Sequence, residues 1–123
     1  MNFKIDTKEK MHVITVEQPV LAANMTEELE KELSAFLSTP IKNLVINLGN
    51  VKRIDENIAR TLVIIQQTFY DANNSFVFCN LQPEVENYLE SMELLEMMNV
   101  TPTESEAYDI VQMEEIEREL MGE

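Results

Sequence analysis

The stretch NLGNVKRIDENIARTLVIIQQ, residues 47–67, joins a turn, a polar segment and an amphipathic pattern. Gly49 and Asn50 follow an apolar run and are typical of a turn that closes a strand. Beyond the polar letters KRIDEN, apolar residues recur every three or four positions, at Ile58, Leu62, Ile65 and Phe69, with Val63 and Ile64 widening the stripe. The stretch therefore predicts a strand, a loop and a deeply packed helix, in that order.

Strand patterns lie on both sides of this stretch. KNLVINL, residues 42–48, is almost continuously apolar, as in a strand that is covered on both faces, and FVFC, residues 76–79, has the same character. At the start of the chain, NFKIDT and MHVITVE alternate around the charged turn KEK and predict a β-hairpin. A short last strand is expected around Val100.

Three further helices are expected. In residues 24–40, Asn24 followed by Glu27 resembles a capping box, and the amphipathic pattern stops before Pro40. Pro83 suits the first turn of a second helix. Thr103 and Glu106 form a capping box that opens a last helix, whose apolar positions are Ala107, Ile110, Val111 and Leu120.

These elements define one fold class. A hairpin followed by alternating helices and strands predicts an α/β fold with a mixed β-sheet of about four to five strands, flanked by four helices. The length of 123 residues fits a single domain that spans residues 1–123.

Composition excludes several classes of function. Residues 81–123 hold thirteen acidic residues and one arginine, so this third of the chain would repel nucleic acid and anionic membranes. No apolar run is long enough for membrane insertion, and no secretory signal is readable, so a cytoplasmic location is expected.

Residues for catalysis are equally scarce. Two glycines cannot build a phosphate-binding loop, and the single His12 and single Cys79 cannot build a metal site. Cys79 fits a small buried residue on a strand. We therefore expect no catalytic residues, no cofactor and no metal.

The segment KRIDEN has two interpretations. Asp55 or Asn57 could simply cap the helix that follows, with the neighbouring charged side chains in water. A loop between a strand and a helix N-terminus is also where α/β proteins commonly place function. The residue pattern leaves both interpretations open.

A family resemblance bears on this choice. NLGNVKRIDENI resembles the central motif of STAS domains, the family of bacterial anti-sigma-factor antagonists, with Leu48, Val51, Ile54 and Asp55 at matching positions. PVLAANMTEELEKEL and FVFCNLQPEVENYLESMELLEMM are similar to other segments of that family. The resemblance implies a non-enzymatic protein-interaction module, whose docking face is the central loop with the following helix.

The resemblance also implies a switch that this sequence lacks. Family members that regulate sigma factors are phosphorylated on a Ser or Thr of the motif by a kinase that is also the anti-sigma factor. Here Asn57 takes that position, Glu56 precedes it, and Ile58 replaces a glycine. Asn carries no hydroxyl, so phosphorylation at Asn57 is excluded by this alignment, and the bulk of Ile58 is expected to hinder a kinase that packs on the loop.

Two functions follow from the resemblance. The first is an interaction module of bacterial signalling that binds an anti-sigma factor or serine kinase. The second is a cytoplasmic accessory subunit of a membrane transport complex, with a transporter ATPase as partner. In either, the expected contact residues are Asn24, Asp55, Glu56, Asn57, Ile58 and Arg60. The sequence leaves open whether the hairpin edge forms a homodimer.

Overall fold

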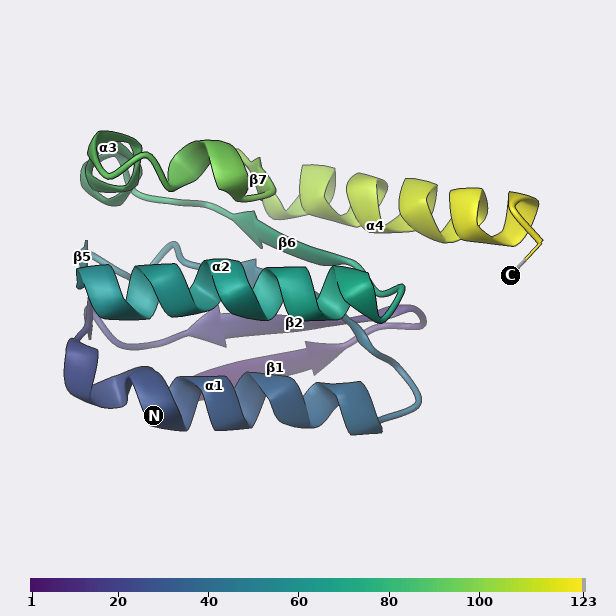
Figure 1. Cartoon of the computed structure of the whole chain (residues 1–123), viewed down its shortest axis with the longest axis horizontal. Coiled ribbons are helices and arrows are strands. Elements are labelled where there is room, and N and C mark those ends of the chain that lie inside the picture. Colours follow the sequence, from purple (N-terminus) through teal and green to yellow (C-terminus); the bar gives the residue numbers. More distant parts are fainter. Residues whose placement is uncertain (123) are drawn as a thin grey trace.

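The computed structural model describes residues 1–122, which form a mixed β-sheet packed against four α-helices (Figure 1). The strands are β1 (Phe3–Thr7), β2 (Met11–Val16), β3 (Val20–Leu21), β4 (Asn43–Asn47), β5 (Arg53–Ile54), β6 (Phe76–Cys79) and β7 (Val100–Thr101). The α-helices are α1 (Thr26–Ser34), α2 (Glu56–Asp71), α3 (Pro83–Ser91) and α4 (Glu104–Leu120). Short 3-10 helices are η1 (Ala23–Met25), η2 (Ala35–Ser38) and η3 (Leu95–Met97).

Five strands form the main sheet in the order β1-β2-β4-β6-β7. The hairpin partner β1 runs antiparallel to β2, and the other neighbours are parallel because a helical connection separates each pair. The register aligns Ile14 of β2 with Ile46 of β4, and Ile46 with Phe78 of β6. The α/β fold predicted from the sequence, with its opening hairpin and four flanking helices, is therefore confirmed.

Alternate residues of the central strands serve two cores. Ile14, Ile46 and Phe78 belong to the larger core, which includes the buried stripe of α2. Their neighbours Val13 and Val45 belong to a smaller core on the opposite face, which α4 covers. Burial on both faces explains why β4 and β6 read as continuous apolar runs.

The helix starts only partly follow the sequence signals. Thr103 caps α4 as predicted, since its hydroxyl accepts a hydrogen bond from the Glu106 N–H at 3.2 Å. Pro83 is at the start of α3, as predicted. The prediction that Asn24 caps a helix was wrong, because Asn24 lies inside η1 and α1 begins only at Thr26.

The last helix differs from its predicted pattern at its C-terminal end. Ala107 and Val111 are buried against the sheet, but Leu120 is 80% exposed. The inward positions near that end are occupied by polar residues instead. Arg118 donates hydrogen bonds to the Glu115 carboxylate at 3.1 Å and to the Ser75 hydroxyl at 3.0 Å.

Asn43 completes this polar cluster at the start of β4. Its amide donates to the Glu115 carboxylate at 2.8 Å, and its side-chain oxygen accepts from the Ser75 N–H at 2.8 Å. The hydrogen bond from Asn43, together with the nearby Arg118 and Lys10, holds the pKa of Glu115 below its ordinary value. The cluster therefore ties α4 to the sheet by charge as well as by apolar contact.

Candidate functional site

The loop after β4 has a fixed shape. Leu48 and Val51 are fully buried, and the Leu48 N–H donates to the Cys79 carbonyl at 3.0 Å. Between them, the Gly49 N–H donates to the Asn47 side-chain oxygen at 2.8 Å. A Cβ at position 49 would lie 3.0 Å from that oxygen, so the turn favours glycine. The loop therefore holds the polar segment KRIDEN, residues 52–57, in one position on the surface.

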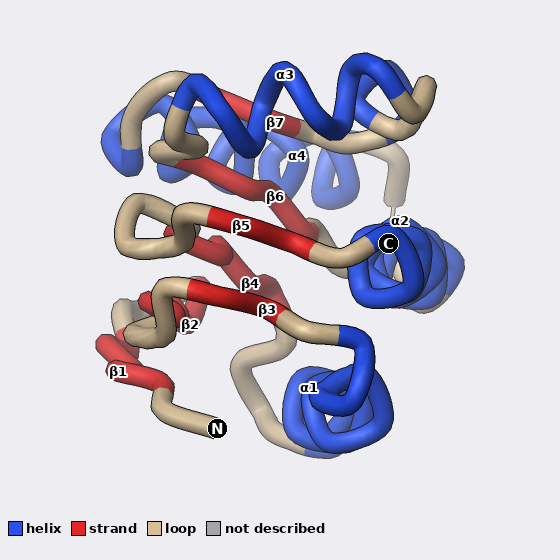
Figure 2. Tube along the Cα trace, turned by 90° about the vertical axis from the view of Figure 1, so that its left-hand side faces the viewer, coloured by secondary structure: helices blue, strands red, loops and turns tan. Residues whose placement is uncertain are grey.

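A second, two-stranded sheet holds the polar segment against the chain that leads into α1. Strands β3 and β5 lie side by side near the starts of α1 and α2 (Figure 2). The N–H groups of Lys52 and Arg53 donate to the Pro19 carbonyl at 2.7 and 3.1 Å, and the Asp55 N–H donates to the Leu21 carbonyl at 2.9 Å. These two-residue strands are too short to leave a periodic signal in the sequence.

Asp55 connects the beginnings of two helices. It occupies the position before α2 with an extended backbone, but its carboxylate makes no hydrogen bond to its own helix. Oδ2 instead accepts the Ala23 N–H at 2.9 Å, beside Asn24 in η1. The structure therefore does not support the interpretation in which Asp55 or Asn57 only caps α2, although the Asp55 charge still lies at the positive end of the helix.

The outer side of α2 presents a ridge made of Asn57, Arg60 and Ile64. These residues are three and four positions apart and so share one face of the helix. Arg60 forms an ion pair with Glu56 at 2.9 Å, and both side chains are exposed. One turn further on, Ile64 is 60% exposed.

Ile64 was predicted to widen the buried stripe, and that prediction was wrong. At six positions after Ile58, its side chain lies about 240° around the helix, on the solvent side. Counting residues from Ile58 would have given this result from the sequence. The α2 surface therefore has an exposed aliphatic side chain bordered by polar groups.

Ile58, in contrast to Ile64, lies on the buried side of α2. Its side chain is fully buried in the larger core, so it offers no surface for a partner and does not crowd the outer side of the loop. The other predicted contact residues, Asn24, Asp55, Glu56, Asn57 and Arg60, are all exposed. We call these five residues together with Ile64 the α2 face.

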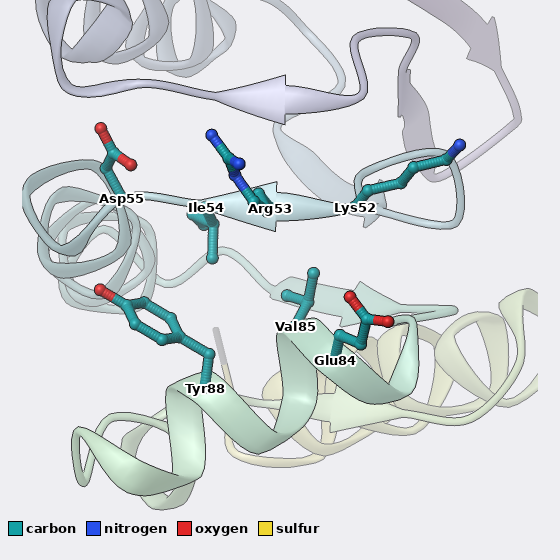
Figure 3. A pocket seen from close by; sticks show the side chains of 7 residues that line it. All are labelled: Lys52, Arg53, Ile54, Asp55, Glu84, Val85 and Tyr88. Carbon is teal, nitrogen blue, oxygen red and sulfur yellow. The ribbon is translucent and has the colours of Figure 1, made fainter.

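A cavity of about 360 Å³ borders the α2 face, between β5 and α3. In Figure 3, Ile54 and Val85 point toward one another across it, and Tyr88 lies on the α3 side below Asp55. The Lys52 and Arg53 side chains extend away from α3 in the same view. The cavity therefore has an apolar floor and opens beside the polar segment.

The histidine and the cysteine, the side chains best suited to chemistry, lie away from the α2 face. Burial raises the pKa of the Cys79 thiol to about 12, with a further contribution from the Glu104 carboxylate, so this thiol is a poor nucleophile. His12 Nδ1 and the Thr7 hydroxyl are 2.8 Å apart, and the ring packs on Phe36. Within residues 1–122, no group of three or more His, Cys, Asp and Glu side chains could hold a metal ion.

Comparison with known proteins identifies the domain family of this chain. The family model for the STAS domain matches residues 2–107, so the chain belongs to the STAS domain family. A comparison with curated protein sequences gives no match. None of the helices within residues 1–122 is sufficiently long and apolar to cross a membrane.

Solved structures share the fold. The anti-sigma factor antagonist SpoIIAA in its unphosphorylated form is 18% identical, with a TM-score of 0.70 over 90% of this chain and 96% of that one. A variant of RsbS from Moorella thermoacetica is 21% identical, with a TM-score of 0.74 over 91% and 96%. The murine anion transporter Slc26a9 is 17% identical, with a TM-score of 0.69 over 85% of this chain but 18% of the transporter.

Proposed function

We propose that residues 1–123 form a single, non-enzymatic STAS domain that binds a protein partner through the α2 face. The observation that carries the proposal is Ile64, which is 60% exposed on a helix whose other apolar side chains are buried or partly buried. An exposed aliphatic side chain bordered by Arg60, Glu56 and Asn57 has the composition of an interface centre with a polar rim.

The adjoining cavity adds a second point of attachment. Its apolar floor between Ile54 and Val85 is suited to one apolar side chain of the partner. The Asp55 carboxylate fixes the relative position of η1 and α2, so Asn24 and Asn57 are presented together. The surface is therefore formed before the partner arrives, and binding needs little ordering of this chain.

The partner we propose is an anti-sigma factor of the serine-kinase type, in cytoplasmic bacterial signalling. Asn57 lies in the exposed first turn of α2, and the resemblance of the motif gives it the place of the hydroxyl residue that the family phosphorylates. Without a hydroxyl, the α2 face keeps the charge of the unphosphorylated state at this position. The protein would then act as an antagonist whose affinity is not switched at position 57.

The likeness to an anion transporter favours a second function. This chain matches 18% of the Slc26a9 chain, so the matching segment is one part of a larger transport protein. This chain would then be an accessory subunit that uses the same α2 face toward a transporter ATPase.

Affinity purification from the native host separates these functions. The tagged chain would be compared with Ile64→Asp, and each captured protein quantified by mass spectrometry. We expect an ATPase of the histidine-kinase type to be captured by the parent and lost with Ile64→Asp. A transport ATPase with the same dependence would support the second function. Partners captured equally by both chains would contradict the role of the α2 face.

A further inference from the structure

The outer side of α4 carries a second apolar surface, far from the polar segment in the sequence. Of the eight large apolar side chains that are exposed within residues 1–122, four lie between residues 113 and 121. Met113 is 56% exposed, Ile116 is 55% exposed and Leu120 is 80% exposed. Their spacing of three and four residues places them on one face of α4, which we call the α4 stripe.

The α4 stripe points away from the sheet. Ala107 and Val111 are buried against the strands, and Arg118 bonds inward to Glu115 and Ser75. Counting about 100° per residue, Ile116 lies almost opposite Ala107 on the helix. In Figure 1 the last turns of α4 extend past the neighbouring elements toward the C-terminal end. The family match ends at residue 107, so the stripe also lies outside the matched segment.

Most of the charges beside the stripe are negative, and the exception is Lys10, whose ammonium group pairs with Glu119 at 3.7 Å. Helix α4 contains seven acidic residues and one basic residue, Arg118, which is turned inward. Glu104, Glu114 and Glu115 also bond inward, which leaves Glu106, Asp109, Glu117 and Glu119 along the outer side. The stripe is therefore an apolar strip with carboxylates on both borders.

We propose that the α4 stripe binds an amphipathic helix of a partner protein, one with an apolar face bordered by Lys and Arg. Apolar residues spaced by three and four positions are the pattern through which two helices pack along their lengths. Basic residues at the borders would meet the exposed carboxylate of Glu117 on one side and would share Glu119 with Lys10 on the other, as complementary charges do beside the apolar seam of paired helices. This contact is independent of the α2 face, so one chain could hold two partners at once.

Charge argues against a second copy of this chain as the occupant. Pairing two α4 helices would bring the same carboxylates together along both borders of the seam. Like charges at such positions oppose association, and the net charge of −14 adds to the repulsion. The acidic borders also oppose an anionic lipid surface.

The test uses two labelled helical peptides as probes of the whole chain. Both carry the same leucine face, but one has lysine at its border positions and the other has glutamate. Fluorescence anisotropy would measure the affinity of each for the parent, for Ile116→Ser and for Ile5→Ser. Ile5 on β1 is the matched control, because it is the same residue type and is 52% exposed.

We expect the lysine peptide to bind and the glutamate peptide to bind at least about tenfold more weakly. Ile116→Ser should weaken lysine-peptide binding by about tenfold or more, with Ile5→Ser unchanged, because only the former removes apolar area from the stripe. Equal loss with both variants, equal binding of both peptides, or no binding would overturn the proposal. A parent dimer that Ile116→Ser dissociates, measured by sedimentation, would assign the stripe to a second copy and overturn it as well.

Discussion

Replacing Asp55 by alanine tests how the α2 face is held in place. The change removes the hydrogen bond from the Ala23 N–H to Asp55 Oδ2, which is 2.9 Å long, and a negative charge at the start of α2. The hydrogen bond contributes about 1 kcal/mol and the charge about 0.5 kcal/mol, so we expect a loss of about 1.5 kcal/mol. For 123 residues this lowers the melting temperature by about 6 °C.

Two further variants separate the hydrogen bond from the charge. Asp55→Asn keeps a side-chain oxygen that can accept the Ala23 N–H, so only the charge contribution of about 0.5 kcal/mol should be lost. Asp71→Ala makes the same truncation at the last residue of α2, where a negative charge is unfavourable and the carboxylate accepts only an exposed hydrogen bond from Gln67 of the same helix, so stability should change by no more than a few tenths of a kcal/mol.

Urea unfolding followed by circular dichroism gives the required free energies. The parent should be the most stable, followed by Asp55→Asn and then Asp55→Ala. The slope of the unfolding free energy against urea concentration should be the same for all three. If Asp55→Ala were as stable as the parent, or Asp71→Ala lost as much, the link between η1 and α2 would not hold the surface together.

Three other predictions follow from the site and the core. Asn57→Asp should change stability by only a few tenths of a kcal/mol, because the charge suits a helix N-terminus, yet should weaken binding of the purified partner in calorimetry. Unchanged affinity would remove position 57 from the interface. Asn57→Ser should gain labelling by a partner kinase, since Ile58 is turned into the core and leaves the first turn accessible; labelling of the parent at another residue would place the switch elsewhere. Glu115 has a lowered pKa, so its charge stabilises the fold above the unfolded pKa of about 4.3, and that stability is lost as pH falls through the lower folded value. The parent should therefore be more stable than Glu115→Gln in urea at pH 7, and the difference should shrink below about pH 4; a constant difference would exclude the ionised carboxylate as its cause.

The main elements were predictable because their signals are local and periodic. The continuous apolar run of β4 and the spacing of Ile58, Leu62, Ile65 and Phe69 gave a strand and a helix with the correct buried face. Thr103 and Glu106 form a local capping pair, and the cap of α4 was read correctly.

The errors concern contacts between distant residues. Asn24 looked like a cap from its neighbours, but Asp55, 31 positions along the chain, accepts the hydrogen bond beside it. Leu120 has an apolar side chain, yet the polar cluster around Arg118 occupies the inward side of that end of α4. The exposed Ile64 is a different kind of error: its spacing from Ile58 places it on the solvent side of α2, but an apolar residue was assumed to be buried.

The most direct test of the α2 face is the affinity of the purified partner for Arg60→Glu, with Lys31→Glu on α1 as the control. Both changes reverse one exposed positive charge, so they alter the net charge equally. Arg60→Glu also replaces the exposed pair with Glu56, which contributes about 0.3–0.5 kcal/mol, by two like charges that cost a similar amount, so stability should fall by less than about 1 kcal/mol. We predict that partner affinity falls about tenfold or more with Arg60→Glu and stays at the parent value with Lys31→Glu. Equal affinities of the two variants would contradict docking through α2.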